Sequence, residues 1–237
     1  KNKPNIYQAA ERYCDEVFFF PINMNQENNV IIYHLNDQSI EYLDLMDLND
    51  TVSGDYRPIY KMENSVWMFP TDLNRDLIRF QLDTRQVEVI PEWKHAVKDI
   101  KLEYTDSYSK LQSIIEIQDK VYHTIKKSKY IVEINKTDFQ VKLHTLQIDV
   151  NLYCHIDFDG EKLWIAAGEN QGVVSWNPVT YEVQYYPIML TGNDIWIDYI
   201  LCGTDYLWLV PKCDDKMIRM NYKTGEYEPI DIFSHNF

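Results

Sequence analysis

The sequence predicts an all-β protein that folds as a β-propeller of four-stranded blades, most simply five of them, with a short helical insertion. A short apolar strand with an aromatic second residue occurs five times, at residues 17–21, 66–70, 121–125, 163–167 and 207–211. A polar gap, another strand, a turn and a last strand follow each copy in the same order. Four strands in a unit of roughly 40 to 50 residues are typical of a propeller blade.

Residue types predict the strands that complete each unit. The strands after the polar gap are rich in β-branched and aromatic residues and lie at 30–35, 77–81, 131–134, 173–177 and 217–221. Turns rich in Asn, Asp, Thr and Gly lead to the last strands, at 40–43, 87–90, 139–143, 182–186 and 227–230. These short segments and their turn residues indicate strands and hairpins rather than helices.

One further strand precedes each aromatic strand. These first strands lie around residues 6–13, 56–62, 113–118, 153–158 and 197–202. The predicted blades therefore span residues 5–45, 54–92, 112–146, 152–188 and 196–232, within a single domain over residues 1–237. The alternative is a β-sandwich, but a sandwich has no reason to repeat the same strand order five times.

Two segments resemble known propeller repeats. Residues 159–165 read Asp-Gly-Glu-Lys-Leu-Trp-Ile, and residues 172–180 read Gly-Val-Val-Ser-Trp-Asn-Pro-Val-Thr. They resemble bacterial sensor-type propeller repeats, Asp-Gly-x-Leu-Trp followed by a strand ending in Asp-Pro-x-Thr-Gly-Glu, and are similar to NHL and streptogramin-lyase-type propellers. The resemblance covers nearly the whole chain as five degenerate repeats and implies a fold rather than a function. The turn glycine is present only as Gly225.

The resemblance leaves the blade number and the chemistry open. Members of these families commonly have six or seven blades, so a truncated or diverged ring is an alternative to five. The streptogramin-lyase resemblance implies a metal-assisted elimination that uses His and Glu, but no residues of this sequence can be assigned to those roles.

The charge excludes several classes of partner. The chain of 237 residues carries 37 acidic and 23 basic residues, a net charge of −14. Such a charge argues against a nucleic-acid backbone or an anionic membrane as the main partner, and it favours a solvated acidic surface. Apolar runs are only a few residues long, so no membrane insertion is expected.

The cysteines give a weak indication of compartment. Cys14, Cys154, Cys202 and Cys213 show no CxxC spacing, so a structural zinc site has no support. We expect free buried thiols in a reducing compartment, which favours the cytoplasm, with disulfides as the alternative. The first residue is Lys1, so we expect a part of a longer protein, extracellular if a signal peptide was removed.

Strand order predicts where a binding surface lies. In antiparallel blades, the connection between the second and third strands opens on the same rim as the connection to the next blade. This rim also receives the insertion at residues 92–112, whose apolar residues recur at helical spacing. Long loops on a rigid scaffold commonly carry binding sites, so we expect a partner here, with capping of the blade edge as the alternative role of the insertion. The candidate binding residues are Asp72, Asn74, Arg75, Asp76, Trp93, Tyr104, Tyr108, Lys127, Glu169, Asn170, Lys212, Asp214 and Asp215.

The five repeated aromatic residues have two interpretations. They are Phe18, Trp67, Tyr122, Trp164 and Trp208. A ring of sugar-stacking side chains is one interpretation. Their equivalent position in every unit favours packing between blades, because aromatic side chains bury large areas.

Catalytic signatures are weak. The sequence has no glycine-rich phosphate loop and no GxSxG motif. His155, Asp157 and Asp198 lie in predicted first strands and could face a central channel, where such groups bind metals or transfer protons. Strand histidines are more often core residues, so we assign no catalytic residue, metal or cofactor.

Three functional hypotheses follow. The first is a non-enzymatic binding module that recognises a protein, peptide or glycan through its loop-rich rim. The second is a carbohydrate-active or lyase-type enzyme that uses channel carboxylates or histidines. The third is the sensor domain of a larger signalling protein.

Overall fold

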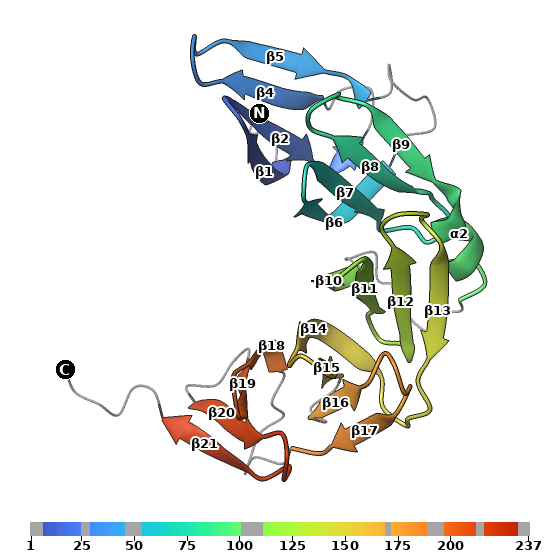
Figure 1. Cartoon of the computed structure of the whole chain (residues 1–237), viewed down its shortest axis with the longest axis vertical. Coiled ribbons are helices and arrows are strands. Elements are labelled where there is room, and N and C mark those ends of the chain that lie inside the picture. Colours follow the sequence, from blue (N-terminus) through green and yellow to red (C-terminus); the bar gives the residue numbers. More distant parts are fainter. Residues whose placement is uncertain are drawn as a thin grey trace, which may run out of the picture. The chain divides into compact units, whose positions relative to one another are not determined.

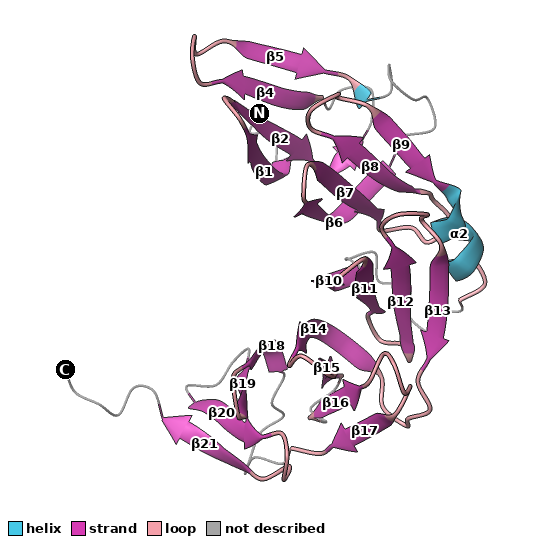
Figure 2. Cartoon of the chain, viewed as in Figure 1, coloured by secondary structure: helices cyan, strands magenta, loops and turns pink. Residues whose placement is uncertain are grey.

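The computed structural model describes residues 7–24, 29–45, 54–100, 111–168, 172–188, 197–211 and 216–231. In this part of the chain, five antiparallel sheets form, one for each predicted blade, and we number them blades 1 to 5 (Figure 1, Figure 2). Four sheets have four strands, and the sheet of blade 2 has one short strand more. The predicted all-β class with five repeated four-stranded units is confirmed.

The strands lie close to the predicted boundaries. Blade 1 contains β1 (Tyr7–Tyr13), β2 (Glu16–Pro21), β4 (Val30–His34) and β5 (Ile40–Leu43). Blade 2 contains β6 (Gly54–Met62), β7 (Ser65–Pro70), β8 (Leu77–Gln81) and β9 (Val87–Ile90). Blade 3 contains β10 (Leu111–Ile117), β11 (Lys120–Ile125), β12 (Tyr130–Asn135) and β13 (Val141–Thr145). Blade 4 contains β14 (Leu152–Phe158), β15 (Leu163–Ala167), β16 (Val173–Trp176) and β17 (Val183–Tyr186). Blade 5 contains β18 (Ile197–Cys202), β19 (Tyr206–Pro211), β20 (Lys216–Asn221) and β21 (Tyr227–Asp231).

The strands of each blade pair in chain order, so that residues on successive strands face one another in a fixed register. We call the three residues directly opposite one another on the second, third and fourth strands the cross-strand row. The five rows are Phe18–Ile32–Glu41, Trp67–Arg79–Glu88, Tyr122–Glu133–Lys142, Trp164–Ser175–Gln184 and Trp208–Arg219–Glu228. Side chains directly opposite on a sheet share one face, so each row can be compared with the others position by position.

The repeated aromatic residues begin these rows and lie mostly in the interior. Phe18, Trp67, Tyr122 and Trp164 are at most 3% exposed, and Trp208 is half-buried. Their burial supports packing between blades over a ring of sugar-stacking side chains, because a stacked sugar needs an exposed ring face.

The turn between the third and fourth strands has the same backbone in every blade. One residue there has a positive φ of 57° to 77°, and its N–H donates to the carbonyl four residues earlier. We call this the turn position, and it is occupied by Gln38, Arg85, Phe139, Tyr181 and Gly225. Four blades therefore place a side chain in a left-handed backbone conformation that favours glycine.

The described residues form two compact units, each considered by itself. The first contains blades 1 and 2 with the helix α2 (Pro91–Val97), and the second contains blades 3, 4 and 5. A single domain over residues 1–237 stays a prediction.

In the first unit, blades 1 and 2 share an aromatic core. The ring of Phe80 in blade 2 lies 6.0 Å from that of Phe18 and 5.5 Å from that of Phe20, both in blade 1. The short strand β3 (Asn23–Met24) also pairs with β6 of blade 2. Both contacts join the two sheets.

The predicted helix in the insertion is present, but it packs inward. Trp93 and Val97 on α2 are fully buried, and the Trp93 ring lies edge-on to Phe69 at 5.5 Å. A ring with no exposed surface cannot contact a ligand, so the interpretation of Trp93 as a binding residue is corrected to a core role. Tyr104 and Tyr108 lie outside the described residues.

In the second unit, aromatic pairs join successive blades. Tyr122 of blade 3 meets Trp176 of blade 4 edge-on at 5.9 Å, and Trp164 of blade 4 lies 6.2 Å from Tyr222 of blade 5. Both interfaces therefore place an aromatic row residue against the next sheet, but the space around the two pairs is filled differently.

Candidate functional site

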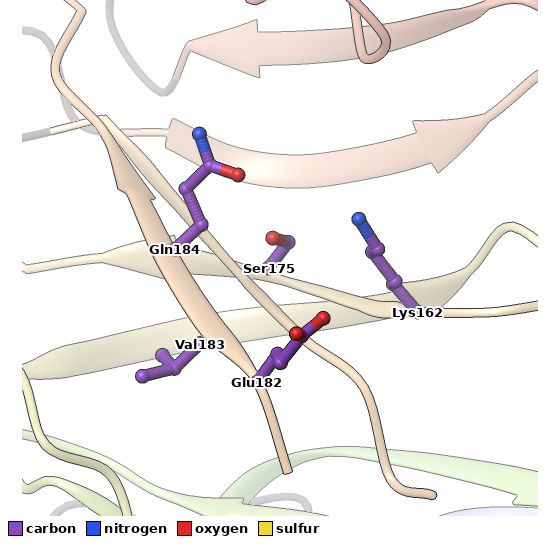
Figure 3. Close-up of a pocket in the computed structure, with 5 residues that line it drawn as sticks. All are labelled: Lys162, Ser175, Glu182, Val183 and Gln184. Carbon is purple, nitrogen blue, oxygen red and sulfur yellow. The ribbon is translucent and has the colours of Figure 1, made fainter. Parts of the chain in front are cut away.

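Two adjoining pockets share Lys162 and Gln184 of blade 4, and the second of them also reaches the turn at residues 222–224 of blade 5. The first has a volume of about 470 Å³ and is lined by Lys162, Ser175, Glu182, Val183 and Gln184 (Figure 3). The second has a volume of about 350 Å³ and is lined by Asp159, Glu161, Lys162, Trp164, Gln184, Tyr186, Tyr222, Lys223 and Thr224. We call the two pockets together the blade 4–5 cleft.

The first pocket is polar, and its side chains are poorly paired. Ser175 and Gln184 belong to the cross-strand row of blade 4, and Lys162 lies two residues before the row's Trp164. The polar ends of Lys162, Ser175 and Glu182 face one open space, with Gln184 beside it (Figure 3). Ser175 is only 2% exposed. Among the described residues, neither its hydroxyl nor the Lys162 ammonium has a hydrogen-bond or ion-pair partner.

The second pocket is more ordered. Asp159 accepts hydrogen bonds from Trp164 Nε1 at 2.7 Å and from the backbone N–H of Lys162 at 2.7 Å. The hydroxyl of Tyr222 donates to the carbonyl of Thr204. The Trp164 ring lies 5.3 Å from that of Tyr186, so these contacts form a rigid aromatic wall.

The interface between blades 3 and 4 shows what fills this space elsewhere. There the row residue Glu133 pairs with Lys120 at 2.7 Å and lies 2.8 Å from His144 Nε2. Tyr181, at the turn position of blade 4, stacks on His144 at 5.6 Å, and its hydroxyl accepts a hydrogen bond from Lys142. The equivalent space is therefore packed.

Two small residues make the blade 4–5 cleft. Ser175 occupies the row position of Glu133, and Gly225 occupies the turn position of Tyr181. A Cβ atom on Gly225 would lie 3.2 Å from the Tyr186 ring, so the glycine lets the turn approach that ring closely. Both replacements remove side chains that fill the neighbouring interface.

At the interface of blades 1 and 2, a network of charged side chains occupies the space that corresponds to the blade 4–5 cleft. Arg85, at the turn position of blade 2, donates to both carboxylate oxygens of Glu41 at 2.8 and 2.9 Å and to Glu16 at 2.7 Å. His34 lies 3.2 Å from Glu16 and 3.3 Å from Glu41. The turn position therefore carries an interface side chain in blades 2 and 4 but none in blade 5.

Comparisons with known proteins agree on the fold. No family model and no curated protein matches the sequence. The structure is similar to virginiamycin B lyase from Staphylococcus aureus, with 16% identity over 99% of this chain and 73% of that one and a TM-score of 0.62. It is also similar to YCF48 bound to D1 peptide, with 11% identity over 94% and 66% of the chains and a TM-score of 0.64.

A third similar structure belongs to a much longer chain. It is the extracellular domain of the putative one component system BT4673 from B. thetaiotaomicron, with 12% identity over 94% of this chain but 27% of that chain and a TM-score of 0.59. The protein is a β-propeller. Identities this low establish the propeller fold alone. No helix among the propeller's described residues is long and apolar enough to cross a membrane.

The predicted rim residues of the propeller fall into separate places. Asp72 and Asn74 form a closed turn between β7 and β8, in which Asp72 Oδ1 accepts the backbone N–H of Asn74 at 3.0 Å. The N–H of Arg75 donates to the carbonyl of Asp72, and Asp76 follows directly. Lys127 lies in the other compact unit, where its N–H donates to the carbonyl of Leu152.

The remaining rim residues lie outside the described part of the chain. They are Glu169, Asn170, Lys212, Asp214 and Asp215. The blade 4–5 cleft is lined by turns of the opposite rim, at residues 159–162 and 222–224. A partner on the rim chosen from the sequence stays a prediction.

The predicted channel residues join two blades of the propeller. His155 Nδ1 accepts the N–H of Ile200 at 3.2 Å, and Asp157 accepts the N–H of Cys202 at 2.7 Å. Burial lowers the pKa of His155, which keeps the imidazole neutral as an acceptor. Asp198 is half-buried in β18. These contacts give His155 and Asp157 a role in holding β14 against β18.

Within the described ranges of the propeller, free thiols are present and a metal-binding cluster is not. Those ranges contain no group of three or more His, Cys, Asp or Glu side chains that could hold a metal ion. Cys14 and Cys202 are free thiols, but Cys14 is exposed and Cys202 is half-buried, so the prediction of buried thiols is wrong for Cys14. Burial raises the pKa of Cys202. The side chain of Cys154 and all of Cys213 lie outside the description.

The repeat pattern carries a signal for the cleft, although none of its lining residues is among the predicted binding residues. Lys120-Val121-Tyr122 and Lys162-Leu163-Trp164 share a Lys two residues before the repeated aromatic. The strands that follow place Glu133 and Ser175 opposite those aromatics. When the repeats are aligned on Tyr122 and Trp164, Lys162 has the position of the paired Lys120, but blade 4 has Ser175 where blade 3 has Glu133.

Proposed function

We propose that this β-propeller is a non-enzymatic binding module that takes an extended segment of a protein into the blade 4–5 cleft. One observation carries the proposal: two joined pockets lie where another blade interface of the same unit is packed. Their polar side chains include Lys162 and Ser175, which have no partner among the described residues. Clefts with a few convergent polar groups beside aromatic side chains are common binding sites.

A peptide fits the cleft better than a glycan does. Trp164 is 1% exposed, and its indole N–H is already bonded to Asp159, so it offers no face for a sugar ring. Backbone amides of an extended peptide can bond with Gln184 and with the exposed turn at residues 222–224. The similarity to YCF48, solved with a peptide bound, supports a peptide ligand on this fold.

The experiment uses a variant that closes the cleft in a way the fold already tolerates. Blades 2 and 5 carry Trp–Arg–Glu rows, and blade 4 carries Trp–Ser–Gln. Ser175→Arg combined with Gln184→Glu gives blade 4 the same row, in which Arg and Glu pair as Arg79 and Glu88 do at 3.1 Å. We expect this double variant to fold and to fill the first pocket.

A random library of displayed 11-residue peptides is selected on the unaltered protein, and the enriched peptides are measured by fluorescence polarisation. We expect micromolar binding that falls at least tenfold in the double variant. Val179→Ser, at a residue 81% exposed, is the control and should bind normally. Absence of any enriched peptide, or equal binding by the double variant, would contradict the proposal.

A further inference from the structure

Equivalent lysines of blades 3 and 4 have different surroundings: Lys120 is paired with a carboxylate, whereas Lys162 lines a pocket. In blade 3, Lys120 lies two residues before the row aromatic Tyr122, and its Nζ is 2.7 Å from a carboxylate oxygen of Glu133. In blade 4, Lys162 stands at the same position before Trp164, and the row residue opposite Trp164 is Ser175. The cation is retained, and the carboxylate that neutralises it in blade 3 is missing.

The missing carboxylate leaves both space and hydrogen-bond donors. The first pocket, of about 470 Å³, occupies this place and is lined by Lys162, Ser175 and Gln184. Ser175 is 2% exposed as a residue, and its hydroxyl and the Gln184 amide can both donate to an anion. The Ser175 hydroxyl has no partner among the described residues, so it can bond a ligand oxygen without giving up another hydrogen bond.

We propose that the blade 4–5 cleft seats a carboxylate of the bound peptide against Lys162, Ser175 and Gln184, in the place that Glu133 occupies between blades 3 and 4. This inference rests on the proposed function and adds the chemical class of the group that is recognised. The carboxylate comes from an acidic side chain or from the C-terminus of the peptide. Lys162 supplies a charge-assisted hydrogen bond, which is stronger than a neutral one.

A carboxylate near the pocket, that of Glu182, repels an acidic ligand and provides a further test of the proposal. The Glu182 side chain lines the same pocket and faces the same space (Figure 3). Removing this like charge by Glu182→Gln should therefore strengthen binding of an acidic peptide. Asp159 is already engaged by Trp164 Nε1 and two backbone N–H groups, so it competes little for Lys162.

Three peptide libraries distinguish the sources of the carboxylate. The first is acetyl-X5-Glu-X5-amide, the second is acetyl-X5-Gln-X5-amide, and the third is acetyl-X5-Gln-X5 with a free C-terminus, where X excludes Asp and Glu. Selection of peptides from the first library indicates an acidic side chain, and selection from the third alone indicates a C-terminal carboxylate. If peptides of the second library, which have no carboxylate, bind as tightly as those of the first and third, carboxylate recognition by Lys162, Ser175 and Gln184 is refuted. The proposed function would remain intact. No binder from any library would instead contradict the proposed function.

Variants of Lys162 and Ser175 are then measured for their affinity for the peptide that binds most tightly. We expect Lys162→Met to weaken binding about 10- to 100-fold, the usual range for losing a hydrogen bond to a charged group. Ser175→Glu should restore the pair of blade 3 and block the acidic peptide, whereas Ser175→Ala should weaken binding only slightly. Lys162→Glu should select Lys or Arg in a library that allows them. Unchanged affinity in Lys162→Met, with peptide binding retained, would refute the seat.

Discussion

Lys120 and Glu133 form a 2.7 Å ion pair on the face of blade 3 that packs against blade 4, and Glu133 is 9% exposed. His144 Nε2 lies 2.8 Å from the other carboxylate oxygen of Glu133. Desolvation acts to raise the pKa of Glu133, but the Lys120 ammonium and the hydrogen bond to His144 together hold it below its usual range. This carboxylate is thus a structural part of the interface between two blades.

We predict that Glu133→Gln lowers the free energy of unfolding by about 2 kcal/mol, because a neutral amide replaces a largely buried carboxylate that bonds both Lys120 and His144. Urea denaturation at pH 7 measures the change. Glu228→Gln, which removes the exposed carboxylate paired with Arg219 in blade 5, is the matched control and should cost much less. Equal losses in the two variants would contradict the structural role of Glu133.

His123 makes stability depend on pH. The side chain is fully buried, its Nδ1 lies 2.8 Å from the carbonyl of Ser113, and burial lowers its pKa to about 4. In the unfolded chain the imidazole takes up a proton near its ordinary pKa of about 6.5, but the folded protein keeps it neutral until about pH 4. The stability gained is therefore present above pH 6.5 and is lost as the pH falls towards 4, by roughly 3 kcal/mol.

The variant His123→Leu tests this assignment. The equivalent position of blade 5 is Leu209, so leucine suits the site. We expect the variant to lose the part of the pH dependence between pH 6.5 and 4 that belongs to His123, as measured by urea denaturation at several pH values. The exposed His95 offers a control, since His95→Leu should keep the slope of the unaltered protein.

Arg85 should stabilise the interface of blades 1 and 2 through charge. Its guanidinium forms ion pairs with both Glu41 and Glu16, and all three side chains are partly exposed. We predict that Arg85→Gln lowers the free energy of unfolding by about 1 kcal/mol, because solvent screens such pairs. The loss should shrink in 1 M salt, whereas a loss independent of salt would point to packing instead.

Gly225 should resist substitution more than Gly160, another glycine with a positive φ. Its φ is +77°, and a Cβ atom would lie 3.2 Å from the Tyr186 ring, whereas a Cβ on Gly160, with φ +101°, would meet nothing within 4 Å. We predict that Gly225→Ala costs about 1 to 2 kcal/mol from backbone strain and crowding, and Gly160→Ala only the strain. Thermal denaturation of the two variants compares them, and a smaller loss for Gly225→Ala would contradict the close approach.

Much of the fold could be predicted because its signals are local. Alternating apolar residues and turn residues within about ten positions determine each hairpin, and the repeated aromatic marks the second strand of every blade. The core role of Phe18, Trp67, Tyr122 and Trp164 followed from the same repetition. The burial of Trp93 did not, because an apolar helical stripe indicates a buried face without saying whether a ligand or the blade edge covers it.

By itself, the sequence determined the five repeated sheets, the order of their strands and the aromatic core, because these depend on neighbours along the chain. Only the tertiary structure decided that the interface of blades 4 and 5 is hollow while that of blades 3 and 4 is packed. The blade 4–5 cleft depends on Ser175 and Lys162 lining one pocket on the sheet of blade 4 and on the turn of Gly225 approaching Tyr186 from blade 5. Such contacts depend on strand register and on packing between sheets, which bring together residues far apart in the sequence.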